Sequence, residues 1–400
     1  MNLLEEVKKY EQKIINHRRY LHENAEVHND LPITTKYVMD QLKGMGYDPK
    51  EITKSGVVAL AGGKKPGKTF MLRGDMDALP LKEQVNLPYK SKTDNMHACG
   101  HDLHTAMLLG AAQLLKDNED QIEGTVKMMF QPAEETLSGA KDMIDAGLLE
   151  NPTVDAAMMI HAFAGVNVPT GAIIYMTNGL ASASSDWFDI EIQGKGGHGA
   201  TPHSAIDPLV AMSHIHLAIG ELNSREIDPD KFLVATVCKI RGGTTGNIVP
   251  DSSIMTGTIR TFDNEIREYS KRRIQEIADG IARSLRCKAR VRFYSGCPSV
   301  INNKEVNDAV TKYSSNLFGE TALCNASKLF GENARMSGSE DFAFISEKVP
   351  SAFIGIAATL KIDDQVYPHH HPKVAFDEGA LSVGAVVYAN TAIEWLKEHK

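Results

Sequence analysis

The chain has 400 residues, which allows two or three domains with ample material for a buried core. Hydrophobic residues make up 42% of it and charged residues 24%, a composition typical of globular proteins. The formal net charge is −8 and no dense Lys/Arg run occurs, so nucleic-acid binding is not an expected function.

Membrane and secretory signals are also missing from the pattern. No stretch of about 18 apolar residues occurs, so no membrane span is predicted. The N-terminal segment MNLLEEVKKYEQKIINHRRY indicates an amphipathic helix and lacks the apolar core of a signal peptide. Five scattered cysteines, an odd number, predict reduced thiols and a cytoplasmic location.

The first part of the chain predicts helices over residues 2–22 and 31–46 and strands over 57–61 and 69–73. Residues 62–69 connect these two strands and include the first residue of the second one. They fit the phosphate-loop pattern G-x-x-x-x-G-K-T. That pattern requires a helix beginning at its Lys-Thr, whereas a strand is expected here. We therefore interpret the segment as a Lys/Gly/Pro hairpin turn, with nucleotide binding as the weaker alternative.

Metal-ligating residue types recur where predicted strands end. NMHACGHDLHT at 95–105 holds a thiol, three imidazoles and a carboxylate ahead of a buried helix. Strands expected at 125–130 and 154–160 are followed by the acidic pair of QPAEE and by His161. Thiolate and imidazole together suit a late first-row divalent ion. A lone histidine or a glutamate pair is usually structural, so their joint placement is what favours a metal site.

The alternation of strands and helices predicts an α/β catalytic domain, with a mainly parallel sheet and helices on both faces. From residue 184 the order changes to β-α-β-β-α-β, which predicts an inserted α+β ferredoxin-like domain. Asp207 and Asp263 are expected to cap its two helices. The domain limits are therefore 1–183 with 297–400 for the catalytic domain and 184–296 for the inserted lid and dimerisation domain.

The last part of the chain is expected to return to the first domain. It predicts a helix over 303–318, a strand over 352–357 and a final helix over 380–398. Before that helix, YPHHHP at 367–372 brings three more imidazoles. Because a helix follows it, this histidine run belongs to the fold and is not a tag.

The motifs RGDMDALP, NMHACGHDLHTA, FQPAEE, GKGGHGATPH, GGTTGNIVPD, GTIRTF, GSEDF and HHHPKVAFDE follow one another in this order. The ordered set resembles the M20 metallopeptidase superfamily, in its amidohydrolase branch of aminoacylases, hippurate hydrolases and auxin-conjugate hydrolases. The resemblance runs from about His17 to the last helix. Ala25 stands where the family usually has Pro, and Leu31 where an acidic residue is common, which affects substrate detail and not the chemistry.

This resemblance implies a site for two divalent metal ions, with Zn, Mn, Co and Ni all compatible. Cys99 would be the bridging thiolate between them. The other ligands would be His101, Glu135, His161 and His370, the histidine two positions before Pro372 in the HHHP run.

It also implies the residues that act on the substrate. Glu134 would be the general base that takes a proton from metal-bound water. His198, in the inserted domain, would stabilise the oxyanion in the active site of the partner subunit. Asn247 and Arg260 would hold the substrate carboxylate.

Asp77 is interpreted as a carboxylate that orients a ligand imidazole, and Asp102 as a second one. Structural alternatives stay open at several positions. Cys99 could be a small buried apolar side chain, and Arg260 could simply pair with surface acids. His104 is expected to be structural or to support a ligand.

The resulting hypothesis is a metal-dependent amidohydrolase that splits N-acyl-L-amino acids into a carboxylic acid and a free amino acid. The acyl group would be acetyl, benzoyl or another aryl-acyl group. One alternative is an N-acetyl-diaminopimelate deacetylase. Another, of a different class, is a non-catalytic metal- or peptide-binding protein, which would be marked by loss of Glu134. The expected partners are the small-molecule substrate and a second copy of the chain, in a homodimer formed through the inserted domain.

Overall fold

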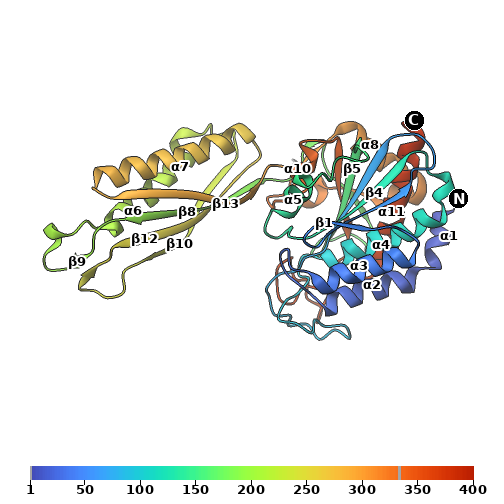
Figure 1. Ribbon diagram of the computed structural model, residues 1–400, viewed down its shortest axis with the longest axis horizontal. Helices are drawn as coiled ribbons and strands as arrows, with labels where there is room; N and C mark the ends of the chain where they lie inside the picture. The colour runs from blue at the N-terminus through green and yellow to red at the C-terminus, as the bar shows by residue number, and fades with distance from the viewer. Residues whose placement is uncertain (1, 332–334) are drawn as a thin grey trace. The chain divides into compact units, whose positions relative to one another are not determined.

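The computed structural model describes residues 2–331 and 335–400, which form two compact units (Figure 1). The first unit comprises Met1–Ala181, Val300–Met336 and Asp341–Lys400. The second comprises Ser182–Ser299 together with Ser337–Glu340.

The first unit is built on an eight-stranded sheet with the order β1-β2-β4-β3-β5-β16-β6-β15. Its strands are β1 (Lys50–Thr53), β2 (Gly56–Gly62), β3 (Thr69–Asp75), β4 (Thr125–Gln131), β5 (Ala156–Phe163), β6 (Ile173–Tyr175), β15 (Leu323–Asn325) and β16 (Ser351–Ala357). The four neighbours β4, β3, β5 and β16 are parallel, so their carboxyl ends meet at one edge. The predicted α/β class with a mainly parallel sheet is confirmed.

Both faces of this sheet are buried. Phe70 and Leu72 face one hydrophobic core, whereas Met71 between them faces another, as the two-residue period of a strand requires. On the first face lie α1 (Leu3–Lys8), α2 (Glu11–Glu23), α3 (Pro32–Gly44), α4 (His101–Asp117), α8 (Lys304–Phe318) and α11 (Ala380–Glu398). On the second lie α5 (Gly139–Asp145), α9 (Ser327–Phe330) and α10 (Ala343–Ser346). The short strands β7 (Gly179–Leu180) and β14 (Ile301–Asn302) pair with each other.

The hairpin predicted at residues 62–69 is wrong. Strand β4 lies between β2 and β3, antiparallel to the first and parallel to the second, so β2 and β3 do not pair. Gly62 and Gly63 take positive φ angles of 79° and 75°, and Thr125 N–H donates to the Lys68 carbonyl, which fixes this crossing loop. A strand follows the loop, as expected, so no helix begins where a phosphate loop would need one.

Helix limits differ from the sequence pattern in two places. The helix expected over 2–22 is interrupted at Lys9 and Tyr10, between α1 and α2. The buried helix expected to begin at Ala106 begins five residues earlier, at His101. Two candidate site residues, His101 and Asp102, therefore lie in the first turn of α4.

The second unit has a four-stranded antiparallel sheet in the order β10-β12-β8-β13. Its strands are β8 (Ser184–Gln193), β10 (Leu233–Gly242), β12 (Ser252–Thr261) and β13 (Lys288–Cys297), and its helices are α6 (Pro208–Glu221) and α7 (Asn264–Ser284). Both helices pack on one face of the sheet through a shared core (Figure 1). Asp207 and Asp263 cap these helices, as the sequence predicts. The element order and strand order confirm the ferredoxin-like fold.

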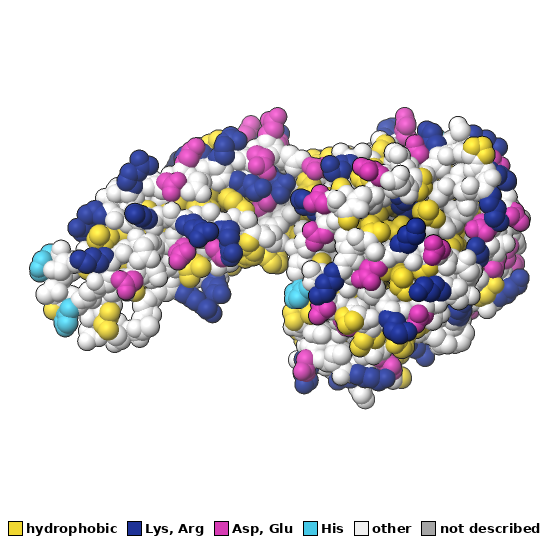
Figure 2. Space-filling view, in the orientation of Figure 1, with side chains coloured by type: hydrophobic (Ala, Val, Ile, Leu, Met, Phe, Trp, Pro, Cys, Tyr) yellow, Lys and Arg dark blue, Asp and Glu magenta, His cyan; other side chains and the backbone are white. Residues whose placement is uncertain are grey.

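Two loops of this unit pair through the short strands β9 (Gly197–His198) and β11 (Ile248–Val249). On the face drawn in Figure 2, basic and acidic side chains are interspersed and do not gather into one large basic patch. Among the described helices, none combines the length and the hydropathy needed to cross a bilayer.

A candidate metal centre at the strand ends

Several groups of potential metal ligands lie close together among the described residues, and two of these groups share Cys99. The ligand atoms of Cys99, His101 and His161 all lie within 4.8 Å of one another. Those of Cys99, Glu135 and His370 also lie within 4.8 Å of one another. The Cys99 sulfur belongs to both groups, so one atom is placed where it can contact two ions.

The Cys99 and His101 side chains come from the beginning of α4, on either side of Gly100. Gly100 adopts φ 89°, in the left-handed region that disfavours other residues. A Cβ atom there would also lie 3.1 Å from the Phe376 ring. A glycine is therefore required for the turn that places the thiol and the imidazole beside each other.

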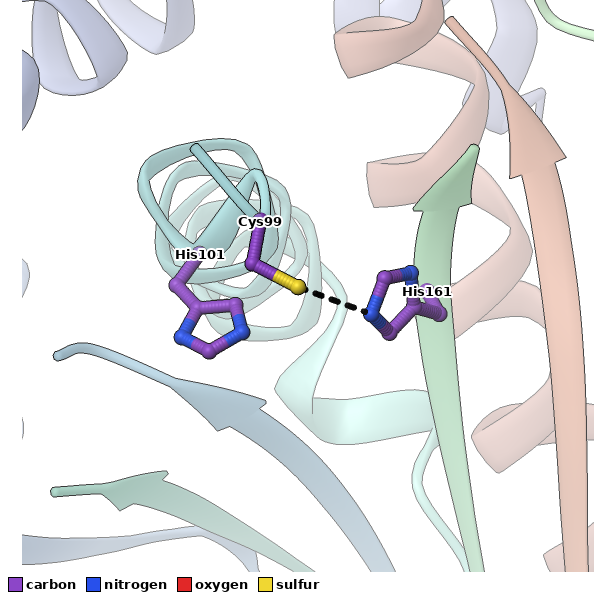
Figure 3. A group of neighbouring side chains, drawn as sticks. All are labelled: Cys99, His101 and His161. Atoms are coloured by element: carbon purple, nitrogen blue, oxygen red, sulfur yellow. Dashed lines mark hydrogen bonds between the residues drawn. The ribbon is translucent and has the colours of Figure 1, made fainter. Parts of the chain in front are cut away.

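Hydrogen bonds fix the tautomers of both histidines. His101 Nδ1 donates to the Asp77 carbonyl over 2.8 Å, and His161 Nδ1 donates to the Ala162 carbonyl over 2.8 Å. The Nε2 lone pairs are therefore available as ligands. His161 Nε2 lies 3.7 Å from Cys99 Sγ (Figure 3), while His101 Nε2 is buried without a hydrogen-bond partner among the described residues.

Glu135 and His370 complete the second group. Glu135 Oε1 is buried without a hydrogen-bond partner among the described residues and lies 3.5 Å from His370 Nε2. His370 has φ 62°, an uncommon value for a non-glycine residue. Its backbone N–H donates to the Ala98 carbonyl over 3.0 Å. The histidine loop is thereby tied directly to the segment that carries Cys99.

Asp77 connects the two halves of the site. Its buried carboxylate accepts hydrogen bonds from the backbone N–H groups of Glu134 and Glu135, at 3.0 and 3.1 Å. Its carbonyl receives the His101 Nδ1 hydrogen bond. Its contact with the ligand imidazole therefore runs mainly through the backbone, and its carboxylate orients the glutamate pair.

Glu134 lies beside the ligand groups and is itself buried, with 6% of its surface exposed. Its carboxylate oxygen lies 3.8 Å from His101 Nε2. It follows Ala133, which has φ 57° and whose N–H donates to the His28 carbonyl. This strained, hydrogen-bonded turn leads from the end of β4 at Gln131 into the two adjacent glutamates.

A network of charged side chains, which the sequence pattern did not indicate, lies next to the candidate ligands and supports them. Asp75, at the end of β3, accepts hydrogen bonds from His104 Nδ1 over 2.6 Å and from Arg73 over 2.7 Å. His104 Nε2 in turn accepts from the Ala162 N–H over 2.7 Å. Arg73 also donates to Asp341 of the GSEDF motif over 3.0 Å. All these side chains are buried.

His369, next to His370 in the same loop, is also held in place. Its Nε2 accepts a hydrogen bond from the Ala164 N–H over 3.0 Å, and its ring centroid lies 5.5 Å from that of His161. His371, in the same run, stacks on Tyr367 at 4.7 Å. His369 and His371 therefore pack the loop, whereas His370 faces Glu135.

Burial and neighbouring charges shift the pKa values of the candidate ligands away from their usual values. Burial raises the pKa of Glu135 to about 7, with the charge of Asp77 adding to it and His101 opposing it. Burial, followed by the charge of Glu135, raises the pKa of the Cys99 thiol well above its usual value. Burial lowers the pKa of His161, which keeps its ring neutral. A cation among them would stabilise the carboxylate and the thiolate.

Asp102 does not hydrogen-bond to a ligand imidazole in this structure. Its hydrogen bonds come from Arg18 Nε at 2.8 Å and His22 Nδ1 at 2.9 Å, both in α2. The charge of Arg18 and the His22 hydrogen bond outweigh burial and hold the pKa of Asp102 far below its usual value. It follows His101 in the chain and lies beside the site without entering it.

The remaining candidates lie in the second unit. His198 is exposed in β9, with Nδ1 accepting from the Ala200 N–H over 3.0 Å. Asn247 is exposed on the paired loop, and its carbonyl accepts from the Gly199 N–H over 2.8 Å. Arg260 lies towards the end of β12, half-buried, and donates to Ser339 Oγ over 3.0 Å. The structure thus brings the His198 and Asn247 loops together, while Arg260 comes from the sheet.

Comparison with known proteins gives consistent matches. The family described as peptidase family M20/M25/M40 matches residues 71–394. Thermostable carboxypeptidase 2 of Saccharolobus solfataricus is 38% identical, over 98% of each chain. Hippurate hydrolase of Campylobacter jejuni is 37% identical, over 99% of this chain and 100% of that protein. N-acetyl-L-cysteine deacetylase of Bacillus subtilis is 36% identical, over 93% of this chain and 85% of that protein. The crystal structure of the Bacillus subtilis YXEP protein, a dinuclear metal binding peptidase from the M20 family, superposes with a TM-score of 0.79 at 32% identity, covering 98% of this chain and 99% of that one.

Proposed function

Because the chain belongs to peptidase family M20/M25/M40, we propose that it is a metal-dependent amidohydrolase that splits N-acyl-L-amino acids into a carboxylic acid and a free amino acid. The observation that carries this proposal is the pair of ligand groups that share the Cys99 sulfur. The relatives named as a hippurate hydrolase and an N-acetyl-L-cysteine deacetylase support the substrate class.

The proposed ligands are Cys99, His101, Glu135, His161 and His370, holding two divalent ions with the thiolate between them. Support comes from the donor set of one sulfur, one carboxylate and three imidazoles, which suits Zn, Mn, Co or Ni. It also comes from the buried ligand atoms of His101 and Glu135, which have no protein partner among the described residues. Asp77 would keep the His101 ring and the Glu135 backbone in place.

Glu134 is the proposed general base. Divalent ions in this site would polarise the scissile carbonyl and lower the pKa of water from 15.7 toward about 7. Glu134 would take the proton from water and return it to the amide nitrogen, a contribution of about 10²–10⁴-fold. Its burial, and the hydrogen bond from its N–H to Asp77, support a fixed position next to the ligands.

Three residues of the second unit are proposed to act on the substrate. Arg260 and Asn247 would hold its carboxylate, and His198 would donate a hydrogen bond to the oxyanion in the active site of a partner subunit. Exposure of His198 and Asn247 supports contact with something outside their own unit. Burial lowers the pKa of Arg260, but it remains a cation because its usual value is far above neutral pH.

A homodimer formed through the second unit is also proposed. Strand β10 is an edge of the sheet and is mostly exposed, and exposed edges are prone to pair with another chain. Ile240 on this strand is 47% exposed. On α6, Val210 and Leu217 are 45% and 70% exposed and lie two turns apart on one face. A second copy would cover this apolar surface.

A cytoplasmic location is proposed from the cysteines. All five are free thiols, including the exposed Cys238. Free thiols persist where the compartment is reducing.

A second candidate function is release of the C-terminal residue of a peptide, favoured by the relative named as a carboxypeptidase. Both reactions cleave an amide bond on the amino side of a residue with a free carboxylate. The two differ only in what lies on the acyl side. N-acetyl-diaminopimelate remains a further alternative substrate.

Metal analysis joined to a hydrolysis screen tests the proposal. The purified protein would be assayed on hippurate, N-acetyl-L-cysteine, N-acetyl-diaminopimelate and a short peptide, before and after removal of metal with a chelator. Two ions per chain are expected, with hydrolysis of N-acyl amino acids lost on chelation and restored by Zn, Mn, Co or Ni. Full activity after complete metal removal would overturn the mechanism.

The base assignment has its own test. Glu134→Gln is expected to keep both ions and to lower kcat by about 10²–10⁴-fold. Glu305→Gln, an exposed substitution in α8, serves as the matched control and should leave kcat unchanged. A normal rate in metal-loaded Glu134→Gln would contradict the assignment.

A further inference from the structure

A cluster of buried polar side chains lies where α2 meets the beginning of α4, and the mechanism proposed above does not use it. Its members are Arg18, His22, Glu83, His97 and Asp102, none more than 4% exposed. Buried charges of this kind are costly unless they are paired. The presence of these charged side chains in the core therefore indicates a structural or functional role.

The cluster is centred on Asp102. Arg18 Nε and His22 Nδ1 both donate to Asp102 Oδ2, at 2.8 and 2.9 Å. His22 Nε2 pairs with Glu83 over 3.3 Å, and Glu83 also accepts from the Ser91 N–H over 2.7 Å. Helix α2 thus reaches across to the second residue of α4 through two side chains.

The beginning of α4 depends on this anchor. No side-chain hydrogen bond caps the helix, because Gly100 occupies the position where Ser, Thr, Asp or Asn usually provides one. Asp102, in the first turn, instead supplies a negative charge that the helix dipole favours. Since His101 precedes it directly, a shift of Asp102 would move the His101 ring and the Cys99 thiol.

The other end of the ligand segment also meets the cluster. His97, two residues before Cys99, is 1% exposed, and its ring centroid lies 6.2 Å from that of His22. Neither ring nitrogen has a hydrogen-bond partner among the described residues. Ala98, between His97 and Cys99, accepts the His370 N–H. The segment 97–102 is therefore bounded on both sides by side chains packed around His22.

We propose that Arg18 and His22 are positioning residues for the metal centre. By holding Asp102 they fix the first turn of α4, and with it the distance between the Cys99 sulfur and His101 Nε2. The proposal rests on the metal centre proposed above. Loss of a residue that hydrogen-bonds to a metal ligand usually weakens metal affinity or activity by about 10–100-fold. Arg18 and His22 act one residue further away, through Asp102, so an effect at the lower end of this range, about tenfold, is expected here.

The experiment measures metal affinity separately from fold stability. Apoprotein is titrated with Co²⁺, and the absorption of the Co²⁺–thiolate contact reports both affinity and ligand geometry. Urea unfolding of the same apoprotein gives its stability. The variants are Arg18→Met, Arg18→Lys and His22→Gln.

The second unit offers a matched control. Arg267 in α7 pairs with Asp186 through hydrogen bonds of 2.5 and 2.8 Å, with side chains 13% and 3% exposed. Arg267→Met breaks a comparable Arg–Asp pair in a unit that holds none of the proposed ligands. It should lower the apoprotein's stability and leave Co²⁺ affinity and spectrum unchanged.

Arg18→Met and His22→Gln are expected to weaken Co²⁺ binding by about tenfold and to alter the thiolate absorption, with partial recovery in Arg18→Lys. Unchanged affinity and spectrum, with stability lowered as in Arg267→Met, would show a purely structural role and overturn the proposal. If Arg18→Met does not fold, His22→Gln decides, because it keeps the buried Arg18–Asp102 ion pair. Failure of the unaltered protein to bind Co²⁺ would instead overturn the metal centre itself.

Discussion

The two regions that carry candidate functional residues differ in how firmly those residues are held. In the first unit the candidate ligands stand at strand ends and at the beginning of a helix, and His101 and His161 are each fixed by a 2.8 Å hydrogen bond to a carbonyl. In the second unit His198 and Asn247 are exposed on paired loops, and their hydrogen bonds to other described residues stay within these two loops.

This difference matches two chemical demands. A metal site must hold its ligands within a narrow range of distances and angles, so it benefits from buried, hydrogen-bonded side chains. Residues that close over a substrate must also move away to release the product. Substitutions in the first region should therefore change metal binding, whereas substitutions in the second should leave metal bound and change turnover or substrate affinity.

Replacement of Cys99 is expected to have the largest effect, because its sulfur is common to both ligand groups. Cys99→Ala should lose the stoichiometric pair of ions and lower hydrolysis to the level of the chelated enzyme. Metal analysis and the hippurate assay measure both. The exposed Cys238→Ala should change neither. Retention of two tightly bound ions by Cys99→Ala would show that the thiolate is not the bridge.

Replacement of His198 should show most clearly that the two regions have different roles. His198→Ala is expected to keep both ions and to lower kcat by about 10²–10³-fold, the usual cost of losing an oxyanion donor. Lys288→Ala, an exposed residue at the start of β13 and outside the proposed dimer surface, is the control.

Mixed dimers then test whether His198 acts across subunits. A His198→Ala chain combined with a Glu134→Gln chain can assemble one complete site only if the histidine comes from the partner. Recovery of hippurate hydrolysis on mixing is expected. Absence of recovery in dimers shown to contain both chains would place His198 in its own subunit's site.

Arg260 is expected to affect substrate affinity more than turnover. Arg260→Lys keeps the charge but loses the planar fork that binds a carboxylate through two parallel hydrogen bonds. A rise in KM of about tenfold or more is expected, since a charged hydrogen bond contributes about 1.5–3 kcal/mol. Arg292→Lys, an exposed arginine of β13, is the control. A substrate amide that lacks the carboxylate should be hydrolysed equally by Arg260→Lys and the unaltered enzyme.

Much of the site could be predicted because its residues are chemically distinctive and stand next to recognisable elements. Thiol, imidazole and paired carboxylates at strand ends indicated Cys99, His161 and the glutamate pair as candidates, and the family resemblance implied Glu135 as the ligand; the structure brings these residues to one place. The fold class followed from the alternation of strands and helices. Both inferences use patterns that are local in the chain.

The supporting contacts could not be predicted because they join distant segments that carry no local pattern. Arg18 and Asp102 are 84 residues apart, and Arg73 and Asp341 are 268 apart. Asp102 was expected to orient a ligand imidazole, but it hydrogen-bonds to α2. The hairpin at 62–69 failed for a similar reason, since a later strand inserts between two that are adjacent in the chain.

The smallest expected effect concerns the stability of the protein in acid, and it should be confined to the first unit. Burial, with a smaller contribution from the charge of Lys13, lowers the pKa of His17 in α2 to about 4. Above pH 6.5 neither the folded nor the unfolded state protonates this ring. As the pH falls from 6.5 to 4 only the unfolded state gains the proton, so the free energy of unfolding of the first unit should drop by about 3 kcal/mol.

The two tryptophans allow each unit to be followed by itself, because Trp187 lies in the second unit and Trp395 in the first. Urea unfolding of Trp187→Phe should show the acid-dependent loss, and His17→Gln in that background should reduce it, since glutamine can still hydrogen-bond to Tyr37 and does not titrate. Trp395→Phe, which reports the second unit, should show little change over the same pH range. An equal acid dependence with and without His17 would mean that other buried histidines of the first unit set its response to acid.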